Sequence, residues 1–166
     1  MNEITNESRL NVVDQVTYFK FQKRTNINVY INQQSNENET LLEIEHSEFT
    51  DVDAVGLQIW DGALLLANFV IHEGNSLFCD KNILELSSGT GFVSIITAIY
   101  CKHVTCTDIN EAYILETIEK NFKRNNNLIK ATYKIKELNF FKNWTTDIEN
   151  ILNNTEIILA SEGNFS

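Results

Sequence analysis

A short apolar strand that runs into a glycine turn and then into a helix constrains the fold of this chain most. Ile83–Leu86 is apolar apart from Glu85, the turn is Ser87–Gly91, and apolar residues continue at helical spacing over Phe92–Tyr100. Amides at a helix N-terminus lack intrahelical partners, and residues without bulky side chains let a ligand approach them closely. The unit therefore predicts a ligand site at the turn of an α/β fold, although many such folds contain a glycine turn for packing alone.

Strands and helices alternate along the rest of the chain. We predict further strands over 104–107, 132–138 and 157–160, and helices over 57–72, 111–125 and 144–152. Gly74 is a predicted helix stop, and Asn110 is the predicted cap of the helix over 111–125. Short connections of this kind imply right-handed crossovers and a parallel sheet with helices on both faces. The expected fold class is a Rossmann-like, doubly wound α/β core.

The N-terminal part of the chain has a different pattern. Apolar and polar residues partly alternate over 12–31 and again over 41–46, which is typical of half-buried antiparallel strands. Residues 32–40 contain no hydrophobic side chain and predict an exposed loop. We therefore expect a β-rich extension over residues 1–50 and a ligand-binding α/β domain over residues 51–166.

Two carboxylates and one missing glycine narrow the class of ligand. Glu85 precedes the turn, where it can engage a positively charged group directly or through water. Asp108 follows the strand over 104–107, where a carboxylate can accept hydrogen bonds from a ribose diol, cap the next helix, or do both. The dinucleotide pattern G-x-G-x-x-G fails because Ser94 stands at its third glycine. These residues favour S-adenosylmethionine, a nucleoside with an amino-acid tail, over NAD.

Composition limits the partners. The net charge of −10 argues against binding to nucleic acid or anionic lipid and favours a basic partner. No apolar run reaches the ~18 residues of a membrane span. Three cysteines form no even disulfide framework, which indicates an intracellular protein, and Cys101–Cys106 lacks the ligand set of a metal site. We interpret the 22 asparagines as compositional drift without functional content.

Six motifs follow one another over residues 42–162: Ile44–His46, Val55–Ala67, Glu85–Gly91, Cys106–Asp108, Glu137–Phe140 and Leu159–Glu162. In this order they resemble the family-16 protein lysine methyltransferases, which have a seven-β-strand fold. The resemblance implies transfer of a methyl group from S-adenosylmethionine to a lysine side chain of a protein substrate, in the nucleus or the cytoplasm.

The resemblance also implies roles for individual residues. Trp60 matches a tryptophan at the cofactor, and Asp108 matches the acid that binds the ribose. The cofactor's methionine end would lie against the turn, whose matching residues are Glu85, Ser87, Ser88, Gly89 and Gly91. Phe140 takes the position of a ring beside the adenine, and Ser161 lies where the adenosyl side passes. Glu162 begins the acidic motif at the entry for the target lysine and is the candidate catalytic residue.

Two departures from the family pattern leave alternatives open. Ser87 stands where the family usually has glycine, which costs ~1 kcal/mol or more if that backbone needs a positive φ. Only the first four of the seven strands are present, so we expect a truncated or misassembled sequence or a partial isoform. The alternative function is a catalytically inactive fragment or a cofactor-binding module, and a nicotinamide oxidoreductase is the third candidate.

Overall fold

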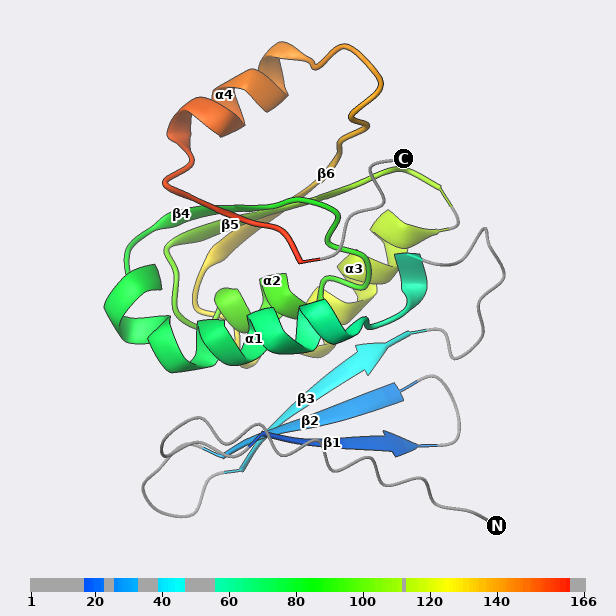
Figure 1. Ribbon diagram of the computed structural model, residues 1–166, viewed down its shortest axis with the longest axis vertical. Helices are drawn as coiled ribbons and strands as arrows, with labels where there is room; N and C mark the ends of the chain where they lie inside the picture. The colour runs from blue at the N-terminus through cyan, green and yellow to red at the C-terminus, as the bar shows by residue number, and fades with distance from the viewer. Residues whose placement is uncertain (1–16, 23–25, 33–38, 47–55, 112, 162–166) are drawn as a thin grey trace.

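The computed structural model describes residues 17–22, 26–32, 39–46, 56–111 and 113–161. Two sheets and four α-helices make up these segments (Figure 1). The N-terminal sheet is an antiparallel meander of β1 (Thr17–Gln22), β2 (Asn26–Asn32) and β3 (Glu39–Glu45). This confirms the predicted β-rich extension. β2 and β3 extend into the two ends of the loop that is predicted over residues 32–40. The predicted boundary between residues 50 and 51, and most of that loop, lie outside the described residues.

The second sheet is parallel and has the predicted Rossmann-like character. Its strands are β4 (Asn82–Glu85), β5 (His103–Asp108), β6 (Thr132–Glu137) and β7 (Ile157–Leu159), in the order β6-β5-β4-β7. The chain moves outward on one side of β4 through β5 and β6, then crosses back to place β7 on the other side. The point where this direction reverses is where α/β sheets usually bind ligands.

Helices cover both faces of the parallel sheet, as predicted. Figure 1 shows α1 (Asp61–Glu73), α2 (Phe92–Thr97) and α3 (Ile114–Arg124) on one face and α4 (Thr146–Asn154) on the other. The three-stranded sheet packs against the helical layer through β3 and α3. Leu42 and Ile44 of β3 belong to the same hydrophobic core as the parallel sheet, so the extension and the α/β part share one core.

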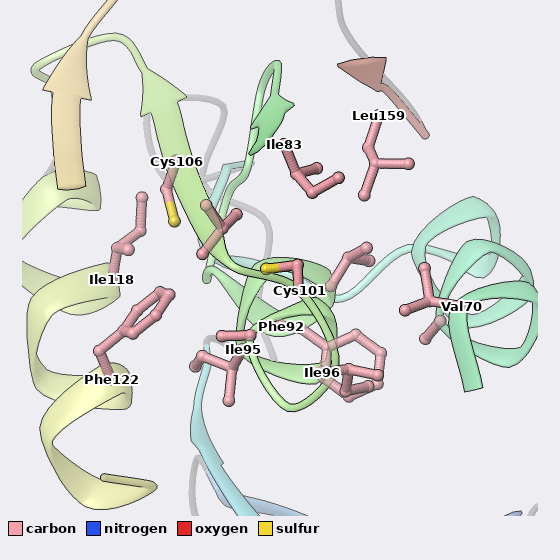
Figure 2. Close-up of a cluster of buried hydrophobic side chains, with 14 of the residues drawn as sticks. Val70, Ile83, Phe92, Ile95, Ile96, Cys101, Cys106, Ile118, Phe122 and Leu159 are labelled. Carbon is pink, nitrogen blue, oxygen red and sulfur yellow. The ribbon is translucent and has the colours of Figure 1, made fainter. Parts of the chain in front are cut away.

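The helix α2 lies at the centre of this core. Figure 2 shows Phe92, Ile95 and Ile96 packed between Ile118 and Phe122 of α3 and Val70 of α1. All six of these side chains are at most 1% exposed. Since α2 directly follows the glycine turn, its burial on every side fixes one end of that turn.

Two cysteine thiols are part of the same core (Figure 2). Burial raises the pKa of Cys101 to about 12 and the pKa of Cys106 well above its ordinary value. A thiol must lose its proton to act as a nucleophile or as a metal ligand. These two cysteines are therefore packing residues, while Cys79 is exposed and free.

One predicted helix end is confirmed and one is wrong. α1 ends at Glu73 with Gly74 as its C-cap, as predicted, and a π-helical turn, Gly74–Phe78, follows. Gly74 has helical backbone angles, and a Cβ there would meet the ring of Tyr100 at 2.5 Å, so close packing explains this glycine better than helix termination. At α3 the N-cap is Tyr113 rather than Asn110, because that helix begins three residues later than predicted.

The role of Gly74 leads to a prediction whose sign depends on its neighbour. In the wild-type background Gly74→Ala should lower the free energy of unfolding by ~1–3 kcal/mol, since the new methyl group overpacks against Tyr100. In a Tyr100→Ala background the same change should raise it by up to ~1 kcal/mol, because alanine has the better helix propensity. Urea unfolding of the four proteins tests this, and destabilisation of equal size in both backgrounds would contradict the packing explanation.

Candidate functional site

The carboxyl ends of the parallel strands form one continuous edge, and those predicted site residues that directly end or follow a described strand lie along it. Leu86 N–H donates to the Leu159 carbonyl across 2.9 Å, and Leu138 N–H donates to the Asp108 carbonyl across 2.8 Å. These bonds tie the chain beyond β4 to β7 and the chain beyond β6 to β5. The edge therefore brings together segments that are far apart in the sequence, as the motif pattern predicts.

The glycine turn between β4 and α2 has an unusual backbone. Ser87, Gly89 and Gly91 have φ values of 53°, 55° and 77°, which lie in the left-handed region. Within the turn, Gly91 N–H donates to the Ser88 carbonyl across 2.8 Å. Alternate left-handed residues fold the chain into a tight bend, and Ser87 meets the condition under which a serine at this position carries a cost in backbone strain.

The turn is also fastened to β5. Ser88 N–H donates to the Thr107 carbonyl across 3.0 Å, and Thr107 N–H donates to the Ser88 hydroxyl across 3.1 Å. The Thr107 hydroxyl donates to the Glu85 carbonyl across 2.7 Å. Ser88 and Thr107 are both buried, so these bonds are shielded from water. The bend is thus held in place by the strand that carries Asp108.

The Asp108 carboxylate lies directly beside the turn. One oxygen, Oδ2, accepts a hydrogen bond from Gly89 N–H across 2.7 Å, and the other, Oδ1, accepts one from Ile109 N–H across 2.7 Å. Burial raises the pKa of Asp108, and the two amide bonds oppose that rise. Neither donor belongs to α3, so the alternative that Asp108 caps that helix is wrong.

The segment before α1 crosses over the turn. A Cβ on Gly89 would lie 2.8 Å from the Gly56 carbonyl oxygen, a distance that real side chains do not tolerate. Only glycine fits at this position, both for its positive φ and for this close approach. The crossing segment leads to Trp60, which is the N-cap of α1 and 41% exposed. The contact of Trp60 with the cofactor, which the resemblance implies, stays a prediction.

Glu85 lies beneath the turn. It is 2% exposed, and its Oε2 accepts a short hydrogen bond from the Ser94 hydroxyl of α2. Burial raises the pKa of Glu85 to about 8, so the side chain is an uncharged acid at neutral pH. In this structure Glu85 supports the turn from below through α2, and its contact with a ligand cation stays a prediction.

The remaining predicted residues fall at the ends of the outer strands. Phe140 follows β6 and Ser161 follows β7, and both side chains are half-buried. Glu162, the candidate catalytic residue, lies outside the described residues.

Sequence reasoning missed Thr107 and the bonding role of Ser94. Ser94 was noticed only as a missing glycine, although a hydroxyl one helical turn into α2 is well placed to reach the strand before the turn.

The backbone of Ser87 leads to a stability prediction. Ser87→Gly should raise the free energy of unfolding by ~0.5–1 kcal/mol, because relief of left-handed strain outweighs the greater entropy of a glycine in the unfolded chain. Thermal unfolding should show a midpoint higher by roughly 1–4 °C. Ser87→Ala is the matched control, since it removes the hydroxyl and keeps the Cβ. Equal effects of the two substitutions would show that strain at the Cβ is not the cause.

The burial of Glu85 leads to a prediction about pH. The folded protein keeps the Glu85 proton up to about pH 8, whereas an unfolded glutamate loses it near 4.5. Between pH 4.5 and about pH 8 the folded state binds more protons than the unfolded state. The stabilisation from the buried Glu85 proton is therefore complete below pH 4.5 and is lost as the pH rises to about 8. Compared with Glu85→Gln, the wild type should lose up to ~1.4 kcal/mol per pH unit across this window.

Unfolding in denaturant at several pH values from 5 to 8 measures this difference. The exposed Glu116 provides the control, since Glu116→Gln makes the same substitution at the protein surface. If the wild type and Glu85→Gln give parallel curves, Glu85 is not buried as an acid.

Comparison with known proteins identifies the family. The model of the lysine methyltransferase family matches residues 35–164. Methyltransferase-like protein 22 of Mus musculus is 32% identical over 138 residues, which cover 74% of this chain and 35% of that protein. Its counterpart in Homo sapiens is 33% identical and covers 74% and 33%. The mouse protein-lysine methyltransferase METTL21E is 31% identical and covers 66% and 45%. The chain thus spans about one third of the length of the first two relatives.

Solved structures are similar only at a distance. A SAM-dependent methyltransferase from Agrobacterium tumefaciens has a TM-score of 0.49 at 11% identity, covering 92% of this chain and 41% of that one. TYW2 of M. jannaschii in complex with AdoMet has a TM-score of 0.40 at 16% identity, covering 72% and 47%. Likenesses this weak do not bear on what this chain binds. The match over residues 35–164 settles the family: this chain belongs to the lysine methyltransferases, a family of enzymes.

Proposed function

We propose that this chain binds S-adenosylmethionine at the carboxyl edge of its parallel sheet and takes part in methyl transfer to a lysine side chain of a protein. One observation carries the proposal. The acid that ends β5 is held against the glycine turn that follows β4, through the 2.7 Å bond from Gly89 N–H to Asp108. In a member of this family, the pairing of a strand-end acid with a left-handed turn supports a nucleoside site.

The Asp108 carboxylate has lone pairs that its hydrogen bonds to Gly89 and Ile109 do not use. A carboxylate offers about four lone-pair positions. Gly89 and Ile109 each take one of them, on different oxygens. Each oxygen can therefore accept one more hydrogen bond, and the two hydroxyl groups of a ribose diol are suitable donors. The two backbone amides would meanwhile keep the carboxylate oriented.

We assign the other predicted residues to parts of the same site. In the proposed site the turn, Ser87–Gly91, lies along the methionine end of the cofactor, and Glu85 supports it from below. Trp60 lies at the rim, while Phe140 and Ser161 lie on the adenosine side at the ends of β6 and β7. The Gly56 carbonyl approaches Gly89 so closely that no side chain fits there, so the backbone alone forms this part of the turn.

Methyl transfer requires the protein mainly to align the methyl donor with the lysine nitrogen. When bound, S-adenosylmethionine supplies a methyl group that its sulfonium already activates. The protein must hold the lysine nitrogen in line with that methyl group. The nitrogen must first give up a proton, because an ammonium has no lone pair, and desolvation lowers the pKa of a lysine. We propose that Glu162 positions the amine at the entry to the site.

Charge and cysteine content support the choice of substrate and compartment. A net charge of −10 favours approach of a basic protein segment that carries the target lysine. The three cysteines are free, which fits the reducing conditions of the nucleus or the cytoplasm. None of the helices in the described segments is long and apolar enough to span a membrane.

Titration with S-adenosylhomocysteine tests the cofactor site. The wild-type chain should bind it, and Asp108→Ala should weaken binding by at least ~10-fold, since charge-assisted hydrogen bonds contribute roughly 1.5–3 kcal/mol. Asp147→Ala is the control, because Asp147 is an exposed aspartate on α4, on the opposite face of the sheet. Calorimetry of the three proteins gives the affinities, and melting curves show that each protein is folded.

The outcomes separate the candidate functions. Equal affinities of the wild type and Asp108→Ala would show that the nucleoside is not bound at this acid. Binding without transfer of a radiolabelled methyl group to basic peptides would favour the inactive cofactor-binding module. Heat from NAD in place of S-adenosylhomocysteine would favour an oxidoreductase.

A further inference from the structure

Two buried asparagines, Asn121 of α3 and its C-cap Asn125, hold the edge strand of the N-terminal sheet. Asn121 Oδ1 accepts from Glu45 N–H across 2.8 Å, and its Nδ2 donates to the Glu45 carbonyl across 3.0 Å. Asn125 repeats the pattern one turn later, with Oδ1 accepting from Glu43 N–H across 2.9 Å and Nδ2 donating to the Glu43 carbonyl across 2.7 Å. Each side chain therefore satisfies both backbone groups of one β3 residue, as a neighbouring strand would.

The two asparagines differ in where their second N–H points. The remaining hydrogen of Asn121 Nδ2 is directed at the Thr90 carbonyl, 2.9 Å away, in the middle of the glycine turn. The remaining hydrogen of Asn125 Nδ2 is directed at the Asn121 carbonyl, 2.8 Å away, within α3 itself. Asn121 is 0% exposed and Thr90 is 2% exposed, so water cannot replace the bond between them.

We propose that Asn121 is a positioning residue that couples docking of the N-terminal sheet to the conformation of the glycine turn. A primary amide has two N–H groups, and Asn121 uses one on β3 and the other on the turn. A shift of β3 away from α3 therefore frees the amide to move, and the Thr90 carbonyl loses its buried donor. In this proposal the N-terminal sheet supports the glycine turn. That the turn binds a cofactor rests on the proposed function.

The coupling must act in both directions. If docking of the sheet stabilises the binding-competent turn, a ligand that stabilises the turn must also stabilise docking by the same factor. The ion pairs of Glu45 with Arg124 and Lys120, at 2.7 and 3.7 Å, bind the same strand but do not touch the turn. Coupling is thus specific to Asn121, and Asn125 provides a matched control one helical turn away.

The first experiment compares Asn121→Ala with Asn125→Ala. Both variants remove one clamp on β3, and both should be less stable than the wild type. Asn121→Ala should weaken S-adenosylhomocysteine binding by about 5–10-fold more than Asn125→Ala, because it alone removes a hydrogen bond to the turn. The titration is made at a temperature at which melting curves show all three proteins to be folded.

The second experiment measures hydrogen exchange, first without ligand and then with it. Gly91 N–H is bonded to the Ser88 carbonyl within the turn, so its hydrogen exchange reports on the turn itself. In Asn121→Ala this amide should exchange at least about fivefold faster than in Asn125→Ala. Adding S-adenosylhomocysteine should slow exchange at Glu45 N–H in the wild type and in Asn125→Ala, where the bond from Glu45 N–H to Asn121 Oδ1 is intact. A purely structural role of Asn121 would leave exchange at Glu45 unchanged by the ligand.

The results distinguish this inference from the proposed function. Wild-type protein that binds S-adenosylhomocysteine while both variants lose equal affinity would overturn the coupling and leave the function standing. Wild-type protein that does not bind it would overturn the function, and exchange at Gly91 would still decide the coupling. If either alanine variant fails to fold, Asn121→Ser and Asn125→Ser replace the pair, and equal exchange at Gly91 in these two proteins would also refute the proposal.

Discussion

The hydrogen bond between Gly89 N–H and the Asp108 carboxylate is the contact on which the site depends. It joins the turn after β4 to the end of β5, and it requires a backbone that only glycine can adopt beneath the Gly56 carbonyl. Burial alone would favour the neutral form of Asp108, and the two amide bonds favour the charged form. A carboxylate held in this way keeps a fixed direction and still has lone pairs to offer a ligand.

Supports on three sides hold this contact in place. From below, Glu85 and Ser94 join β4 to α2, and α2 is buried among the other helices. From β5, Thr107 exchanges backbone and hydroxyl bonds with Ser88 and Glu85. From α3, Asn121 reaches the Thr90 carbonyl. The left-handed backbone of Ser87 is tolerated because these bonds define the turn so fully.

The sequence predicted the architecture well because hydrophobic periodicity is a local signal. The parallel strands, the helices on both faces and the antiparallel extension are confirmed, with ends that shift by a few residues. The order of motifs along the chain also predicted the family. Residue-level roles that depend on a single neighbour were harder. The prediction for Asn110 failed because α3 begins later than the sequence pattern indicates, and the close packing of Gly74 against the Tyr100 ring was not predicted, because it depends on tertiary structure.

Asparagine shows the limit of composition most clearly. Interpreted as drift, the 22 asparagines carried no information, yet Asn121 and Asn125 clamp β3 to α3. No spacing rule distinguishes them from their exposed neighbours, because their partners are backbone groups some 80 residues earlier in the chain.

The most direct test of the central claim is a crystal structure of this chain with S-adenosylhomocysteine. The account predicts both ribose hydroxyls within hydrogen-bond distance of the Asp108 carboxylate, and a nucleoside bound elsewhere, with Asp108 bonded only to Gly89 and Ile109, would contradict it.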